Sequence, residues 1–106
     1  MIKYDKLVRD KIPEVIESSG KKCDIEILDD KSYLNYLNKK ILEEVNEYLE
    51  SGEVEELADL EEVLRAILDV KSVSYKDFED IRKQKIEKRG AFKKKILLKR
   101  TYSDGE

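Results

Sequence analysis

Two acidic clusters stand on either side of a Ser-Gly break in the stretch EEVNEYLESGEVEELAD, residues 43–59. Glu44 and Glu47 precede the break, and Glu56 and Asp59 follow it. Each pair has the i, i+3 spacing that places two side chains on the same face of a helix. Carboxylate oxygens are the ligands that Mg²⁺ and Mn²⁺ prefer, usually with several waters and substrate phosphates. The spacing therefore predicts a magnesium site, with manganese as an alternative ion.

The residue types that the chain lacks narrow its chemistry. It contains no histidine and a single cysteine, Cys23. Catalysis by Ser-His or Cys-His pairs is therefore excluded, and a zinc site is disfavoured. A lone cysteine forms no intramolecular disulfide, and no apolar run is long enough for a signal peptide or a membrane span. We therefore expect a cytoplasmic protein with no membrane partner, which works with carboxylates, Lys, Arg, Tyr or a metal ion.

The two acidic pairs can meet only if the helices that carry them form an antiparallel hairpin. The first helix is predicted from about Asp30, with the apolar stripe Leu34, Leu37, Ile41, Val45 and Tyr48. The second follows the Ser-Gly break, with the apolar stripe Leu57, Leu60, Leu64, Ile67 and Leu68. At 100° per residue, each acidic pair is displaced from its own stripe by about 70° and about 130°, in the same sense. We therefore expect all four carboxylates along one edge of the hairpin.

The position of the acids along the hairpin agrees with this geometry. Glu44 and Asp59 lie equally far from the Ser-Gly break, and so do Glu47 and Glu56. Helix axes about 8–10 Å apart would let these side chains approach a common cation. Glu44 should therefore lie level with Asp59, and Glu47 with Glu56.

Charge is segregated along the chain. Charged residues make up 44% of its 106 residues, yet the formal net charge is only −3. Every charged residue from Glu43 to Glu62 is acidic, and the stretch from Arg82 to Arg100 is basic apart from Glu87. Acidic side chains at this density repel one another unless a cation binds. The alternative is a solvated, highly charged helical face with no metal ion.

Two further helices are predicted outside the hairpin. The first runs from about Asp10 to Ser18, and Pro13 suits its first turn. The other begins after Ser74 and ends near Lys88, because Gly90 can adopt the left-handed conformation that ends many helices.

Two short segments are predicted to be β-strands. Apolar and polar residues alternate in CDIEIL, residues 23–28, and residues 93–102 contain ILLKRTY, so we expect these segments to pair. With about four helices they predict one mainly α domain, residues 1–106, that has a small two-stranded β element. A chain this short buries only a modest core, so a partner subunit would help to cover its apolar surface.

The acidic stretch is part of a longer pattern. EEVNE followed by ELAD resembles the EExxE…ExxD signature of the all-α nucleoside triphosphate pyrophosphohydrolases, the superfamily of MazG and the phosphoribosyl-ATP pyrophosphohydrolases. KYDKLVRDKIPEVIE, residues 3–17, and KIEKRGAF, residues 85–92, resemble the opening and closing blocks of its small phosphoribosyl-ATP pyrophosphohydrolase-like branch. The resemblance covers nearly the whole chain. One departure is the short spacing between the acidic motifs, eight residues from Tyr48 to Glu55.

The resemblance implies a fold, a reaction and a metal site. The fold is a MazG-like helical bundle completed by a second subunit in a homodimer or a higher homo-oligomer. The reaction is hydrolysis of the α–β phosphoanhydride of a nucleotide, which gives a monophosphate and pyrophosphate. The implied Mg²⁺ ligands are Glu44, Glu47, Glu56 and Asp59, with Glu43 as an additional ligand or a neighbour of one.

The reaction also needs groups for the phosphates and for the attacking water. The resemblance implies phosphate contacts by five cationic side chains, Lys6, Arg9, Lys11, Lys85 and Arg89. Arginine is suited to bidentate phosphate contacts. Since histidine is absent, Glu47 or Glu44 is expected to position or deprotonate the water. The basic run at residues 93–95 is not expected to bind nucleic acid, because the chain is net acidic and has no interleaved aromatic residues there.

Three functions are compatible with these patterns. The first is a pyrophosphohydrolase that removes non-standard or excess nucleotides. The second is the same chemistry on phosphoribosyl-ATP in histidine synthesis. The third is a non-catalytic helical module whose acids bind a basic protein, or which binds a nucleotide as a regulatory signal.

Overall fold

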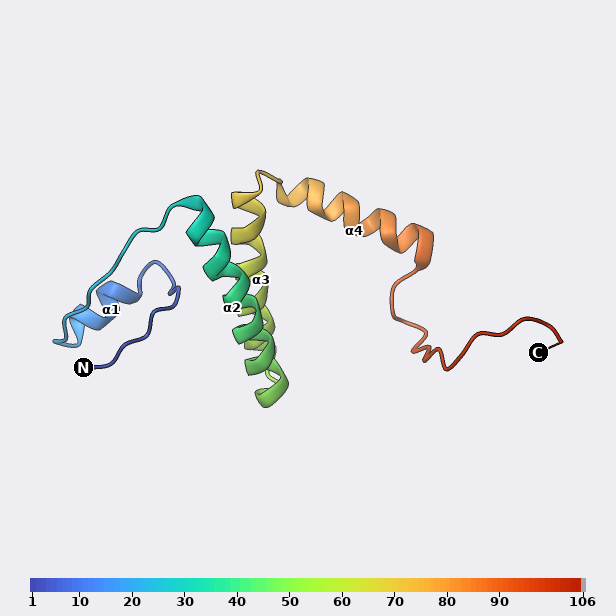
Figure 1. The fold of residues 1–106 in the computed structure, drawn as a ribbon, viewed down its shortest axis with the longest axis horizontal. Helices are drawn as coiled ribbons and strands as arrows, with labels where there is room; N and C mark the ends of the chain where they lie inside the picture. Colours follow the sequence, from blue (N-terminus) through green and yellow to red (C-terminus); the bar gives the residue numbers. More distant parts are fainter. Residues whose placement is uncertain (106) are drawn as a thin grey trace. The chain divides into compact units, whose positions relative to one another are not determined.

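The computed structural model describes residues 1–105, and this part of the chain contains four helices and no strand (Figure 1). The helices are α1 (Ile12–Ser18), α2 (Asp30–Ser51), α3 (Val54–Val70) and α4 (Tyr75–Arg89). The mainly α prediction is therefore confirmed. The chain divides into two compact units, Met1–Tyr75 and Lys76–Glu106, and each is described by itself. No helix of the described residues is long and apolar enough to span a membrane.

The helix boundaries follow local signals in the sequence. Asp29 is the N-cap of α2, and its side chain accepts a hydrogen bond of 2.8 Å from the Ser32 amide. Hydrogen bonds from the Ser32 amide and the Ser32 hydroxyl lower the pKa of Asp29. At the other end, Gly52 has a φ of 68° and its amide donates to the Tyr48 carbonyl at 2.7 Å. That left-handed conformation suits glycine, so α2 ends at the predicted break and α3 begins after Glu53.

The two outer helices also lie close to their predicted ranges. Pro13 is in the first turn of α1, which begins at Ile12, two residues later than the predicted Asp10. α4 ends at Arg89, and the next residue, Gly90, has a φ of 81°. Gly90 therefore supplies the left-handed residue that was expected beyond the helix.

The long hairpin of α2 and α3 holds the core of the first unit (Figure 1). Leu37 on α2 is 4% exposed and Val63 on α3 is 8% exposed, and no other apolar side chain in the described residues is buried. Partly buried residues on both helices extend this line of contact between α2 and α3, which we call the seam. They are Leu34, Ile41, Val45, Tyr48, Leu60, Ile67 and Val70. The predicted stripe of α2 is therefore confirmed. Packing along the seam brings together the two helices that carry the acidic stretches.

The predicted stripe of α3 was wrong in part: Leu60, Ile67 and Leu68 are partly buried as expected, but the buried centre of the stripe lies one residue away. Val63 was not included in it, whereas Leu57 and Leu64 were, and these two are 43% and 37% exposed. Apolar residues cover more than one side of α3, so helical periodicity does not choose between a stripe through Val63 and one through Leu64.

The predicted β element is not confirmed. Residues 23–28 and 93–102 are irregular, and both segments expose large apolar side chains. Ile27 is 88% exposed and Leu97 is 81% exposed. Alternation of apolar and polar residues produces a strand only where a second strand accepts its backbone hydrogen bonds. Neither segment is assigned as a strand in the described part of its own unit.

Candidate metal centre

Three carboxylates from the two helices of the hairpin converge. One oxygen each from Glu44 on α2 and from Glu56 and Asp59 on α3 lie within 4.8 Å of one another. Oxygen atoms on opposite sides of one Ca²⁺ ion, at about 2.3–2.6 Å from it, lie about 5 Å apart, and those on opposite sides of one Mg²⁺ ion, at about 2.0–2.1 Å, lie about 4 Å apart. The spacing of these oxygens therefore suits one divalent cation, and Mg²⁺ would draw them slightly closer together.

The helical repeat explains why the acids meet at the seam. Glu44 lies seven residues after Leu37, and Glu56 lies seven residues before Val63. Residues seven apart share a face of a helix, so the acids continue the line of the buried apolar side chains. The sequence-based displacement of about 70° placed the nearer acids too far from the seam. Glu44 is in fact 6% exposed and lies within it.

Glu44 is the most unusual side chain of the cluster. Its Oε2 atom is buried and has no hydrogen-bond partner within the described residues, while Lys40 Nζ lies 3.8 Å from its Oε1 atom. Burial raises the pKa of Glu44, and so do the neighbouring carboxyl groups of Glu47 and Asp59, while Lys40 opposes them. A buried carboxylate oxygen without a partner costs free energy. A cation at the cluster would supply that partner.

Glu47 completes the predicted set of four. It is an exposed residue of α2. Its carboxyl group raises the pKa of Glu44 on α2 and that of Glu56 on α3. For Glu56, desolvation is the largest cause, followed by the charges of Glu47 and Asp59, and a hydrogen bond from Ser51 opposes the shift. The structure therefore brings three of the four predicted ligands within 4.8 Å, and Glu47 lies near enough to influence two of them. We call the four predicted ligands the acidic quartet: Glu44, Glu47, Glu56 and Asp59.

The buried acid should make the metal-free hairpin less stable. We expect Glu44→Gln to raise the free energy of unfolding without metal by about 1 kcal/mol, because the amide removes a buried charge and can donate to a neighbouring carboxylate. Urea unfolding followed by circular dichroism in the presence of EDTA measures this change. Glu50→Gln is the matched control, because Glu50 is an exposed acid on the same helix and should change stability little. A loss of stability in Glu44→Gln would contradict the repulsion described here.

Two of the predicted phosphate-binding cations contact acids at or beside the quartet. Lys6 Nζ lies 3.1 Å from Glu43 Oε1, and Arg9 Nη2 lies 2.6 Å from Asp59 Oδ1. Lys40 also contacts Glu43, at 3.5 Å. Partial burial alone would raise the pKa of Glu43, but the hydrogen bond from Lys6 and the charge of Lys40 lower it. Glu43 is thus bound by lysines and is not among the converging oxygens.

The other predicted cations lie elsewhere in the chain. Lys11 is the exposed residue that precedes α1. Lys85 and Arg89 lie towards the end of α4 and belong to the second unit, so their predicted roles stay predictions. Lys40 was missed by the sequence reasoning, although its i, i+4 spacing from Glu44 was an available signal.

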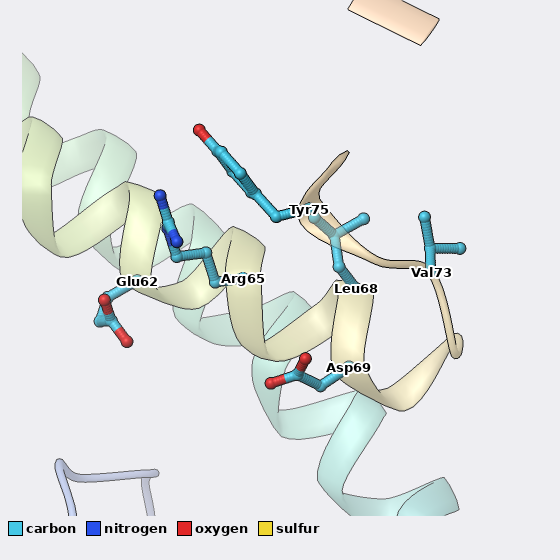
Figure 2. Close-up of a pocket in the computed structure, with 6 residues that line it drawn as sticks. All are labelled: Glu62, Arg65, Leu68, Asp69, Val73 and Tyr75. Atoms are coloured by element: carbon cyan, nitrogen blue, oxygen red, sulfur yellow. The ribbon is translucent and has the colours of Figure 1, made fainter. Parts of the chain in front are cut away.

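A shallow cavity lies farther along α3, and it includes no member of the quartet. Its volume is about 280 Å³, and its lining residues are Glu62, Arg65, Leu68, Asp69, Val73 and Tyr75 (Figure 2). The Arg65 guanidinium lies 3.8 Å from the centre of the Tyr75 ring, and the Tyr75 hydroxyl donates to Glu61 at 3.3 Å. These contacts tie Tyr75 to α3. The cavity is therefore separate from the candidate metal centre.

Comparison of the chain with protein-family profiles, with curated proteins and with solved structures found no match.

Proposed function

We propose that this chain is a Mg²⁺-dependent nucleotide pyrophosphohydrolase, which cleaves the α–β phosphoanhydride of a nucleoside triphosphate or a related nucleotide. The observation that carries the proposal is the convergence of three carboxylate oxygens, from Glu44, Glu56 and Asp59, within 4.8 Å. The unpartnered, buried oxygen of Glu44 supports a cation there, because an acid face that only meets solvent needs no buried carboxylate. The resemblance to the all-α pyrophosphohydrolases suggests the reaction.

The acidic quartet would hold Mg²⁺, or Mn²⁺ in its place. When bound, the ion neutralises phosphate oxygens and lowers the pKa of a bound water. Glu47 is exposed whereas Glu44 is buried, so Glu47 is the carboxylate that can receive a proton from the attacking water. Arg9 and Lys6 contact acids at and next to the quartet, where they are near enough to bind the phosphates of a nucleotide. Lys11, Lys85 and Arg89 are proposed as further phosphate contacts.

The proposal includes a homodimer or a higher homo-oligomer that completes a MazG-like bundle. Apolar residues remain exposed on both helices of the hairpin: Leu42 and Leu49 on α2 are 66% and 72% exposed, and Leu57 and Leu64 on α3 are 43% and 37% exposed. Each pair has a seven-residue spacing, which places its members on one face of their helix. Exposed apolar faces of this kind favour contact with another helical hairpin.

Release of pyrophosphate from a panel of nucleotides tests the proposal. The panel should contain common triphosphates, non-standard triphosphates and phosphoribosyl-ATP, each with Mg²⁺ and with EDTA. We expect Mg²⁺-dependent formation of the monophosphate and pyrophosphate from at least one of them. Mn²⁺ binding without hydrolysis of any nucleotide would favour a non-catalytic module. Hydrolysis confined to phosphoribosyl-ATP would identify the histidine-synthesis reaction.

A further inference from the structure

The segment that precedes α1, residues 1–11, contacts both arms of the hairpin. Lys6 reaches Glu43 on α2, the residue next to the quartet member Glu44, and Arg9 reaches Asp59 on α3. The charge of Asp10 also contributes to the raised pKa of Tyr33 on α2, for which burial is the largest cause. The segment is therefore held beside the quartet by the ion pairs of Lys6 and Arg9.

Arg9 contacts an oxygen of the candidate metal centre itself. The four carboxylates of the quartet have two cationic neighbours in the described residues, Lys40 beside Glu44 at 3.8 Å and Arg9 beside Asp59 at 2.6 Å. The Arg9 contact is the shorter one, and its length is that of a short charge-assisted hydrogen bond. Arg9 thus supplies positive charge where a divalent cation would supply it.

The ion pairs that hold this segment are exposed, so another cation can displace their basic side chains. The side chains of Arg9 and Asp59 are 61% and 39% exposed, and those of Lys6 and Glu43 are 44% and 32% exposed. Exposed ion pairs contribute little to stability because water competes for both charges. A divalent ion held by several carboxylates has twice the charge of a guanidinium and would repel Arg9 at this distance.

We infer that Arg9 is a displaceable counterion of the acidic quartet: it neutralises Asp59 while the centre holds no metal ion, and cation binding releases it. The released guanidinium, still tethered beside the centre, then becomes available to the phosphates of a nucleotide. Metal binding would thus precede productive phosphate binding by Arg9. This inference rests on the proposed function for the identity of the site. It adds the order in which the metal ion and the nucleotide bind.

The alternative role for Arg9 predicts the opposite effect on metal affinity. An arginine that orients a ligand carboxylate strengthens metal binding, and removal of such a partner typically weakens it by about 10–100-fold. A counterion competes with the metal, so its removal strengthens binding. The sign of the change therefore decides between the two roles.

The test is Mn²⁺ binding by the full chain without nucleotide, measured by calorimetry and by electron paramagnetic resonance of free Mn²⁺. We expect Arg9→Gln to bind Mn²⁺ about 2–5-fold more tightly than the unaltered chain, the range that an exposed ion pair would contribute. Arg82→Gln is the matched control, because Arg82 pairs with Glu79 at 2.8 Å and its loss changes the net charge equally. This control should change Mn²⁺ affinity by less than Arg9→Gln does.

A second measurement follows Arg9 directly. The side-chain ¹⁵N–¹H signal of Arg9 should move on addition of Mg²⁺ towards its position in Asp59→Asn, where the ion pair is absent. Unchanged or weaker Mn²⁺ binding by Arg9→Gln, or an Arg9 signal that does not move, would overturn the counterion role and leave the metal site standing. Failure of the unaltered chain to bind Mn²⁺ would defeat the proposed function together with this inference.

Discussion

The Asp59→Asn substitution is expected to lower Mg²⁺-dependent pyrophosphate release by about 100-fold or more. Asp59 supplies one of the three oxygens that lie within 4.8 Å of one another, and an amide oxygen brings no negative charge to the ion. Loss of a group that merely supports a metal ligand typically costs about 10–100-fold in affinity or activity, so loss of a ligand should cost at least the upper value. Steady-state rates over a range of Mg²⁺ concentrations and a Mn²⁺ titration measure the two consequences together.

Glu55→Gln is the control for this substitution. Glu55 is an exposed acid on α3 outside the acidic quartet, and its replacement changes the net charge by the same amount. Its activity should stay within about twofold of the unaltered chain, since substitutions of surface residues away from a site have small effects. Circular dichroism should show that both variants keep their helices. Comparable activity of Asp59→Asn and Glu55→Gln would mean that the reaction does not use this centre.

The convergence of Glu44, Glu56 and Asp59 could be predicted because it depends on residue spacing within a helical hairpin. Once α2 and α3 form an antiparallel hairpin about Gly52, residues at equal distances from the turn lie level with each other. The i, i+3 pairs then place Glu44 and Glu47 on one helix opposite Glu56 and Asp59 on the other. Both facts are properties of the linear sequence and of the regular helix.

The depth of the site could not be predicted in the same way. α3 is apolar on more than one side, and the choice of Val63 over Leu64 as its buried residue depends on how the two helices pack. That choice turns Glu56 and Asp59 on α3 towards the seam, where Glu44 on α2 is 6% exposed. The difference matters because burial is the largest single cause of the raised pKa of Glu44.

The ion pairs of residues 1–11 were beyond sequence reasoning for a different reason. This segment is mostly irregular, so no periodicity relates Lys6 or Arg9 to positions on the hairpin. Their partners, Glu43 and Asp59, lie 37 and 50 residues away in the sequence. The resemblance implied that Lys6 and Arg9 bind phosphates, but their direct contact with the acids follows only from the path of the chain.

The largest effect on stability is expected at Leu37. This side chain is 4% exposed and packs in the seam that contains Val63, so Leu37→Ala should lower the free energy of unfolding by about 2–4 kcal/mol. For a small domain that is a substantial part of the total stability. Urea unfolding followed by circular dichroism measures the loss. Because Glu44 lies on the same face of α2, a loosened seam should also weaken Mn²⁺ binding.

Comparison of Leu42→Ala with Leu37→Ala distinguishes the contribution of the outer surface of the hairpin to stability from that of its core. Leu42 is on the same helix but is 66% exposed, so in an isolated subunit its loss should change stability by no more than about 0.5 kcal/mol. If the exposed leucines form the proposed subunit interface, the effect of Leu42→Ala will grow with protein concentration, because association stabilises only the folded chain. The effect of Leu37→Ala should be present at all concentrations. Equal losses in both variants at low concentration would contradict a seam centred on Leu37 and Val63.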